Sequence, residues 1–541
     1  MALHKQTRRN YGLLFRNPVA ALTVINVGVA LLAFVKDVAL AAYAGTSLQA
    51  DALTLAYFVP DSIGNNLFAA AISVVCIPVF SEMLANNRLK RLRVTVRQLF
   101  VCFIGISFII MAFIFSFPGL LSDLLNQSPD AELTRLIAQL LRLFLPTVAM
   151  FVCVAVGTAI LQALRQFIAP AVAPLFINLC FLAGVLYCRV ADIPLAEGVR
   201  YIAFFITGGV FLVGLWIART GIGSLAKVAA VNRKKGVAET HGQHTEWRGM
   251  MRMLLLYLAI LLSMQAVFFA ERYMITTFAS GAAAALNYAY RLTQFPVWVF
   301  VAAVSVVILP DLSRHIALNE REQAKRLLKR AFRAVVLIVF PAMAFLFLLR
   351  EPVTIGLFQH GAFDDRSVQL TSGILAGYSL SVLSQSISLI SLRFFLAEKN
   401  LIAALLAYAV SALVTISGDF AFTRLLGPPG VGYGAAIGAA VNAALMLTLM
   451  SRSLRPRFAE VRRELAKLGR AAAFPAIYFL LMRALWFLLP AHHSLFALVY
   501  VLLGGFMFLT GYLVLLFGQW PDLLRSLKIQ YGKDESICQR R

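Results

Sequence analysis

Charged residues are scarce in this chain. Only 14% of its 541 residues are Asp, Glu, Lys or Arg, whereas 60% are hydrophobic. A soluble globular protein of this length needs more polar surface than that to cover its core. The composition therefore excludes that class and indicates an integral membrane protein.

Several motifs of soluble enzymes are also missing. The six cysteines form no CxxC pair and no metal-ligand spacing, so we expect small buried hydrophobic side chains there. The sequence has no GxxxxGK[ST] phosphate loop, which argues against ATP drive within this chain. It also has no nucleophile motif and no paired catalytic carboxylates in a polar cleft. We therefore predict a transporter and not an enzyme.

Cations outnumber anions, at 49 Lys and Arg against 25 Asp and Glu, giving a net charge of +24. Such a charge is compatible with a nucleic acid partner, but the cations lie in short blocks between apolar runs, at 86–97, 219–252, 313–333 and 451–470. This placement is typical of cytoplasmic loops in membrane proteins. It predicts no nucleic acid partner, and it places both termini in the cytoplasm.

The apolar runs predict fourteen membrane-spanning helices, since a helix needs roughly 20 apolar residues to cross the hydrocarbon. The predicted spans centre near residues 30, 68, 108, 148, 177, 206, 260, 298, 340, 383, 411, 441, 479 and 506. The cationic blocks follow even-numbered spans, and an odd number of spans would break that alternation.

An internal repeat relates spans 1–2 to spans 7–8. The stretch "AAAISVVCIPVFS" (69–81) matches "VAAVSVVILPDLS" (301–313) at seven of thirteen positions. Upstream, Lys36 matches Arg272 and Pro60 matches Pro296. Six spans separate the copies, so both have the same orientation in the membrane. This predicts an all-α protein with two six-helix lobes related by a pseudo-two-fold axis along the membrane normal, plus helices 13 and 14.

These observations divide the chain into six parts. They are an N-lobe at 1–218, a cytoplasmic linker at 219–252, a C-lobe at 253–452, a cytoplasmic amphipathic segment at 453–470, spans 13–14 at 471–518 and a cytoplasmic tail at 519–541.

Charged side chains inside the predicted spans are the candidate site residues. Each costs on the order of 2.5–3.5 kcal/mol at mid-bilayer and normally faces a bundle interior or a wet cavity. They are Lys36, Asp37, Asp51, Arg142, Glu271, Arg272, Arg291, Arg393 and Asp419. Because the repeat makes Lys36 and Arg272 equivalent, we expect them, with Arg291, to face one cationic cavity that suits a phosphate. In an alternative interpretation, Lys36 and Arg272 pair with the neighbouring acids Asp37 and Glu271.

Span 2 contains the helix-breaking stretch "FVPDSIGNNLFAA" (58–70). It places Pro60 and Gly64 inside the membrane, beside the polar side chains of Asn65 and Asn66. A proline in a spanning helix frees backbone groups that a cavity or neighbouring helices must satisfy. We interpret Pro60, Gly64 and the equivalent Pro296 as hinges next to a substrate cavity; a static kink is the alternative.

Several segments resemble one family, the MurJ/MviN lipid II flippases, which belong to the larger group of multidrug and lipid-linked oligosaccharide exporters. The resemblance is carried by the sequences "FVKDVALAAYAGTSLQADALTLAYFVP" (34–60), "LQALRQFIAPAVAPLFINL" (161–179), "YAYRLTQFPVWVF" (288–300), "LFQHGAFDDRSVQLTSGILAGYSL" (357–380) and "GPPGVGYGAAIGAAVNA" (427–443). Fourteen spans agree with the family.

The resemblance implies transport of an undecaprenyl-pyrophosphate-linked glycan, lipid II above all, from the inner to the outer leaflet of a bacterial inner membrane. It also implies an inside-open V with a cationic cavity for the pyrophosphate, a groove for the lipid tail along spans 13–14, and cell-wall synthesis enzymes as partners. The family's eighth-span arginine falls on Arg291, its first-span Arg-Asp pair on Lys36 and Asp37, and its early span-2 aspartate on Asp51.

This sequence departs from the family at three positions. The second-span arginine falls around Gly64 to Asn66, an earlier first-span arginine falls near Ala30, and an acid of the eighth span is Gln294. Three alternatives to lipid II transport therefore stay open: a flippase for another lipid-linked oligosaccharide or exopolysaccharide unit, a drug/cation antiporter, and a transport-dead scaffold.

Coupling to sodium or protons is a further expectation from the resemblance. Glu271, Asp419 and Asn442 lie in spans 7, 11 and 12, where the family can hold a sodium ion, and oxygen ligands suit a hard cation. Hydrogen bonding between helices is the alternative role for these three side chains.

Overall fold

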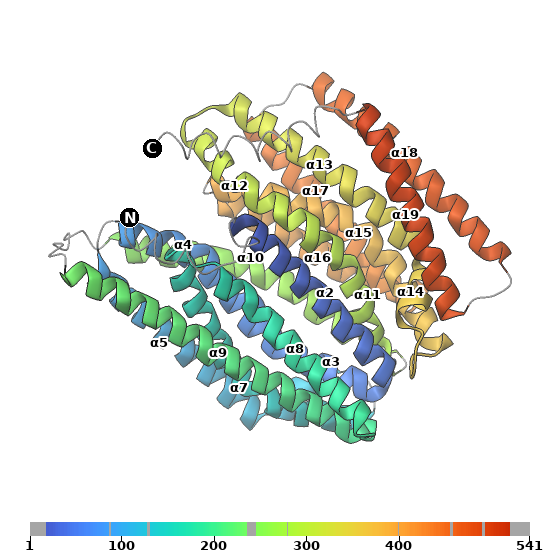
Figure 1. Ribbon diagram of the computed structural model, residues 1–541, viewed down its shortest axis with the longest axis horizontal. Coiled ribbons are helices and arrows are strands. Elements are labelled where there is room, and N and C mark those ends of the chain that lie inside the picture. Colours follow the sequence, from blue (N-terminus) through green and yellow to red (C-terminus); the bar gives the residue numbers. More distant parts are fainter. Residues whose placement is uncertain are drawn as a thin grey trace.

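The computed structural model describes residues 18–85, 88–126, 130–234, 245–278, 280–398, 400–454, 458–489 and 493–519. These residues form helices joined by short turns, without strands (Figure 1). The first 17 residues and residues 520–541, which include Cys538 and all but the first residue of the predicted cytoplasmic tail, lie outside the described part of the chain.

The first half of the chain supplies six spans. Its helices are α2 (Pro18–Ala44), α3 (Leu48–Pro60), η3 (Asp61–Ala69), α4 (Ala70–Ala85), α5 (Leu89–Ser116), α6 (Pro118–Leu125), α7 (Ala131–Ala163), α8 (Ile168–Val190) and α9 (Leu195–Lys234). The run from α3 through α4 is one continuous helix with a π-helical segment, η3, in its middle.

The second half repeats this order and then adds two helices. It contains α10 (Thr245–Ile275), α11 (Ala282–Pro296), η4 (Val297–Val301), α12 (Ala302–Ala317), α13 (Arg321–Leu348), α14 (Arg350–Phe358), α15 (Asp365–Ala397), α16 (Leu401–Leu426), α17 (Pro429–Leu454), α18 (Phe458–Leu488) and α19 (Ser494–Gln519). The predicted lobe limits at residues 218 and 253 fall within α9 and α10.

Thirteen helices in the described residues are long and apolar enough to span a membrane. The continuous run α11–η4–α12, which carries Arg291, is the additional span that completes the predicted fourteen. Each of the fourteen predicted centres lies inside one of these helices.

Helix packing is the same in the two halves. In the first half α2 packs on α8, α3 on α7, and both α7 and α8 on α9. In the second half the equivalent helices pair identically: α10 on α16, α11 on α15, and both α15 and α16 on α17. The two predicted six-helix lobes are therefore confirmed as an architecture.

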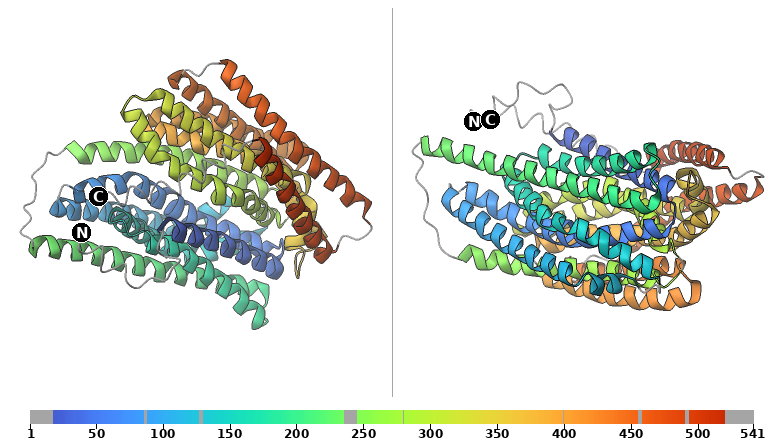
Figure 2. Two further views of the ribbon diagram at one scale, coloured as in Figure 1. Left: turned by 45° about the horizontal axis from the view of Figure 1, so that its top comes forward. Right: turned by 90° about the horizontal axis from the view of Figure 1, so that it is seen from below.

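Helices α18 and α19 lie on the flank of the second lobe. They pack on each other, with α18 on α13 and α19 on α14, and both views of Figure 2 place them at the edge of the molecule. The glycine at 356 permits the close approach to α19, since a Cβ there would lie 2.8 Å from the backbone nitrogen of Leu498.

We call the end of the bundle where α4 meets α5 and α12 meets α13 the basic end, and the opposite end, where α2 meets α3 and α14 meets α15, the far end. Hydrogen bonds between the lobes gather at the far end, for example from Ala362 N to Ala42 O at 3.0 Å. The lobes also touch towards the basic end, because α4 and η3 contact α10. The resemblance implies a V that is open at the basic end. These contacts bring the two lobes together there, so the opening is narrower than that expectation.

Candidate substrate site between the lobes

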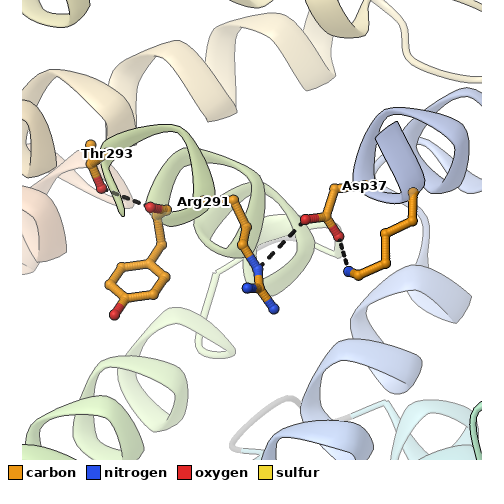
Figure 3. Close-up of polar contacts among 5 residues, drawn as sticks. Asp37, Arg291 and Thr293 are labelled. Carbon is orange, nitrogen blue, oxygen red and sulfur yellow. Dashed lines mark hydrogen bonds and ion pairs between the residues drawn. The ribbon is translucent and has the colours of Figure 1, made fainter. Parts of the chain in front are cut away.

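Asp37 binds a cation from each lobe. It lies on α2 with its side chain 2% exposed, and Lys36 Nζ donates a hydrogen bond of 2.6 Å to its Oδ1. On the other side, Arg291 Nε lies 3.5 Å from Asp37 Oδ2 (Figure 3). Because Lys36 and Asp37 belong to the first lobe and Arg291 to the second, this ion triad joins the lobes, in the half of these helices that is nearer the far end.

Aromatic rings complete the surroundings of the triad. Lys36 Nζ lies 4.4 Å from the ring centroid of Phe181 on α8, and Arg291 Cζ lies 5.6 Å from that of Trp298 on η4. Such cation–π contacts lower the cost of holding a cation away from water. Arg291 remains 26% exposed, so its guanidinium is open to a further partner.

An acid–amide patch lies on η3, where the resemblance implies an arginine. Asn65 Nδ2 donates to Asp61 Oδ1 at 3.2 Å, and Asn66 Nδ2 donates to Asp61 Oδ2 at 3.3 Å. The charge of Asp61 interacts with those of Arg291 and Lys36. Asp61 was not predicted as a site residue. The amides four and five residues after an acid, in an apolar span, were the available signal.

Arg272 does not join the triad. It is 7% exposed, its guanidinium carbon lies 3.8 Å from the ring centroid of Phe58 on α3, and its Nη1 donates to Phe268 O at 3.1 Å. Because Phe58 belongs to the first lobe, Arg272 lies at the interface between the lobes. It is held there by an aromatic ring of the first lobe, and a contact with substrate stays a prediction.

Asp51 binds backbone groups of the other lobe. Its Oδ2 accepts from Gly281 N at 2.6 Å and its Oδ1 from Ala284 N at 2.7 Å, so it caps the N-terminus of α11. The free N–H groups of a helix N-terminus favour a carboxylate. The structure therefore gives Asp51 a role in holding the far end together, and a substrate contact stays a prediction.

Gln294 occupies the family's acid position and turns into its own lobe. Its Nε2 donates to Gln385 Oε1 on α15 at 3.0 Å, and Gln385 Nε2 donates to Ser381 Oγ at 2.8 Å. This chain of hydrogen bonds fixes α11 against α15.

The three predicted ion ligands lie on helices that pack together in the second lobe. Glu271, Asp419 and Asn442 are 1%, 0% and 5% exposed. Within the described residues, both oxygens of Asp419 and one oxygen each of Glu271 and Asn442 have no hydrogen-bond partner. Asp419 lies against Gly434 of α17, whereas Asn442 follows Gly434 by eight residues, about 12 Å further along that helix. Buried oxygens of this kind fit a hard cation or a shared proton.

The predicted hinge residues stand at the π-helical segments. Pro60 ends α3 directly before η3, and Pro296 ends α11 directly before η4. Gly64 lies within η3 against α7, where an added Cβ would come within 2.6 Å of the Phe151 side chain. Both spans thus have a π-helical segment at the predicted hinge, and motion there stays a prediction.

Known proteins resemble this chain in sequence and in fold. The family model described as lipid II flippase MurJ matches residues 40–501. The probable lipid II flippase MurJ of Rhizobium tropici is 26% identical over 367 residues, which cover 66% of each chain, and that of Treponema pallidum is 23% identical over 435 residues, 78% of this chain and 79% of that protein. The match thus spans just under two thirds of the Rhizobium protein.

Solved structures give the same fold. A lipid II flippase MurJ in an inward closed conformation has a TM-score of 0.72 at 20% identity, covering 93% of this chain and 99% of its own. An inward-facing multidrug resistance transporter of the MATE family has a TM-score of 0.64 at 14% identity, covering 80% and 98%. Since the family model spans most of the residues, the chain belongs to the lipid II flippase MurJ family.

Proposed function

We propose that this protein moves an undecaprenyl-pyrophosphate-linked glycan, lipid II first of all, from the leaflet at its basic end to the leaflet at its far end by alternating access. The observation that carries the proposal is the triad of Lys36, Asp37 and Arg291, which brings two cations from different lobes to one carboxylate. Family membership supports the choice of substrate class.

The triad suits a pyrophosphate chemically. Lys36 and Arg291 share the carboxylate of Asp37, and the charge of Asp61 also acts on them, so a pyrophosphate has to displace a carboxylate from these cations. A guanidinium offers two parallel N–H groups to phosphate oxygens, and Arg291 is exposed enough to do so. In this proposal the pyrophosphate takes over part of the cationic surface that Asp37 now holds.

Alternating access follows from the placement of the contacts between the lobes. Three contacts between the lobes close the far end. Asp51 of α3 accepts from Gly281 N at the start of α11, Tyr288 Oη donates to Gly45 O at 3.2 Å, and Thr46 Oγ1 lies 2.8 Å from Ser367 Oγ. Release of the substrate on that side needs these contacts to break while the basic end closes. Two lobes of like orientation can rock in this way around a central site.

Ion coupling and orientation complete the proposal. In this proposal the buried oxygens of Glu271 and Asp419 take sodium or a proton, whose binding relieves the unpartnered carboxylates, and a part for Asn442 in the same site stays a prediction. The cationic loops support an orientation in which the basic end and both termini face the cytoplasm of a bacterium, with the chain in its inner membrane.

A second candidate is a flippase for another lipid-linked glycan. Asp61, Asn65 and Asn66 support it, because they present an acid and two amides where the resemblance implies an arginine. Such side chains fit sugar hydroxyl or amino groups better than a phosphate.

Complementation of a bacterium depleted of its own flippase tests the proposal. Arg291→Ala should abolish growth at normal protein level, Arg291→Lys should restore part of it, and Arg424→Ala, an exposed arginine near the far end of α16, should grow like the wild type. Full growth of Arg291→Ala would exclude Arg291 as a substrate contact.

A further inference from the structure

Two arginines meet at the far end of α13, away from the site between the lobes. Arg350 Nη1 donates to Phe347 O at 3.0 Å, and Arg483 Nη1 donates to Leu348 O at 3.1 Å. These two carbonyls belong to consecutive residues at the C-terminus of one helix, so the guanidinium groups are neighbours. Arg350 comes from α14 and Arg483 from α18.

Neither arginine has an anionic partner within the described part of the chain, where the ion pairs found involve other residues. The residues that join α18 to α19 outside the described part, 490–492, are Pro, Ala and His and bring no carboxylate. Burial, and after it the charge of Arg483, lowers the pKa of Arg350. The acid Glu351, next to Arg350 in the chain, acts on Arg350 more weakly than Arg483 does, so the repulsion between the two cations is only partly compensated.

Capping of α13 does not account for both cations. A helix C-terminus carries about half a negative charge, which one arginine neutralises. Each guanidinium has five N–H groups and uses one of them on a backbone carbonyl, so most donors stay free. Two neighbouring guanidinium groups with free N–H donors are well suited to bind the oxygens of a phosphate.

The apolar surroundings indicate that the phosphate belongs to a lipid. Phe487 and Leu488 are 61% and 80% exposed, and Arg483 Cζ lies 5.3 Å from the Phe487 ring centroid. Large apolar side chains beside a cation pair provide contacts for acyl chains. Arg483 lies five residues before the end of α18, in the last turns of the candidate span Ala466–Leu488.

We propose that Arg350 and Arg483 form a binding site for a phosphate group, as carried by a membrane lipid, in the leaflet at the far end. Figure 1 shows α18 and α19 on the flank of α13 and α14, which leaves this site beside the lobe and not between the lobes. The site is independent of the substrate proposed above.

Lipid binding to the full chain in detergent tests this inference. The probes are phosphatidylglycerol, diacylglycerol as a lipid without phosphate, and inorganic phosphate, and the readouts are the unfolding temperature and the lipids retained in native mass spectrometry. Phosphatidylglycerol should bind the wild type and Arg424→Gln equally, and the double variant Arg350→Gln/Arg483→Gln at least tenfold more weakly. Diacylglycerol should not distinguish these proteins.

Competition by inorganic phosphate would show that the phosphate alone is recognised, whereas lack of competition would show that the acyl chains are needed as well; both outcomes support the site. Equal phosphatidylglycerol affinity in wild type and double variant would overturn it. The variant Arg350→Lys/Arg483→Lys guards against a folding defect, since it keeps both charges and should bind with intermediate affinity.

Discussion

Asp37 is the counter-ion of two cations between the lobes, and its removal should be costly. Asp37→Asn removes the carboxylate that forms the ion pairs with Lys36, which is 4% exposed, and with Arg291. Breaking a buried ion pair from one side costs about 3 kcal/mol. We expect Asp37→Asn to lower the unfolding temperature clearly, and Lys36→Met/Asp37→Asn to recover much of the loss because the second variant removes the buried charge.

Thermal unfolding followed by tryptophan fluorescence measures both variants. Asn65→Ala, which changes an exposed side chain of the acid–amide patch, is the control and should unfold like the wild type. If Asp37→Asn unfolds at the wild-type temperature, Asp37 is not the counter-ion that the geometry makes it.

The charged residues themselves could be predicted from the sequence, but their partners only in part. The cost of a charge in the bilayer identifies Lys36, Asp37 and Arg291, and their pairing follows from α2 and α11 lying against each other. The sequence does not determine which neighbouring helix Arg272 faces. The contact of Arg272 with Phe58 depends on the orientation of α10 relative to α3. Asp61 was missed as a site residue because Asn65 and Asn66, four and five residues later on the same helix, satisfy its carboxylate without a partner from another helix.

At the scale of the elements, the equivalent spans α3–η3–α4 and α11–η4–α12 contain the same sequence of helix types. Each has a proline followed by a π-helical segment, at Pro60 with η3 and at Pro296 with η4. The repeat matches the two prolines, and each proline predicts a disturbed helix at its position. It does not predict a π-helix, because that geometry depends on neighbours such as Phe151 packing against Gly64.

Gly64→Ala tests how tightly η3 is packed. The added methyl group collides with Phe151, so we expect a loss of about 1–3 kcal/mol in the free energy of unfolding. Gly28→Ala in α2 is the matched control, since a Cβ there meets nothing within 4 Å and alanine favours the helix. Chemical unfolding of both variants gives the comparison, and an equal effect of the two substitutions would contradict the packing described for η3.

At the scale of the whole molecule, the far end is closed by contacts between the lobes. Thr46 Oγ1 and Ser367 Oγ lie 2.8 Å apart on different lobes, so cysteines at both positions should form a disulfide in a background without the native cysteines. The oxidised double variant should stop supporting growth of flippase-depleted cells, and a reductant should restore it. Each single cysteine is the control. Unchanged growth with a complete cross-link would show that the far end need not open.

The architecture of the molecule could be predicted, whereas its conformation could not. The alternation of cationic loops and the repeat between 69–81 and 301–313 suffice for fourteen helices in two lobes. The contacts of α4 and η3 with α10, which join the lobes towards the basic end, depend on how the two lobes are oriented relative to each other. Hydrophobic and charge patterns along the sequence do not encode that orientation.

Transport of fluorescent lipid II by the purified protein in liposomes tests the central claim most directly. Our account predicts that the wild type and Arg424→Ala carry lipid II to the opposite leaflet, while Arg291→Ala does so at least tenfold more slowly. If Arg291→Ala keeps the wild-type rate, or if the wild type moves no lipid-linked pyrophosphate at all, the account is contradicted.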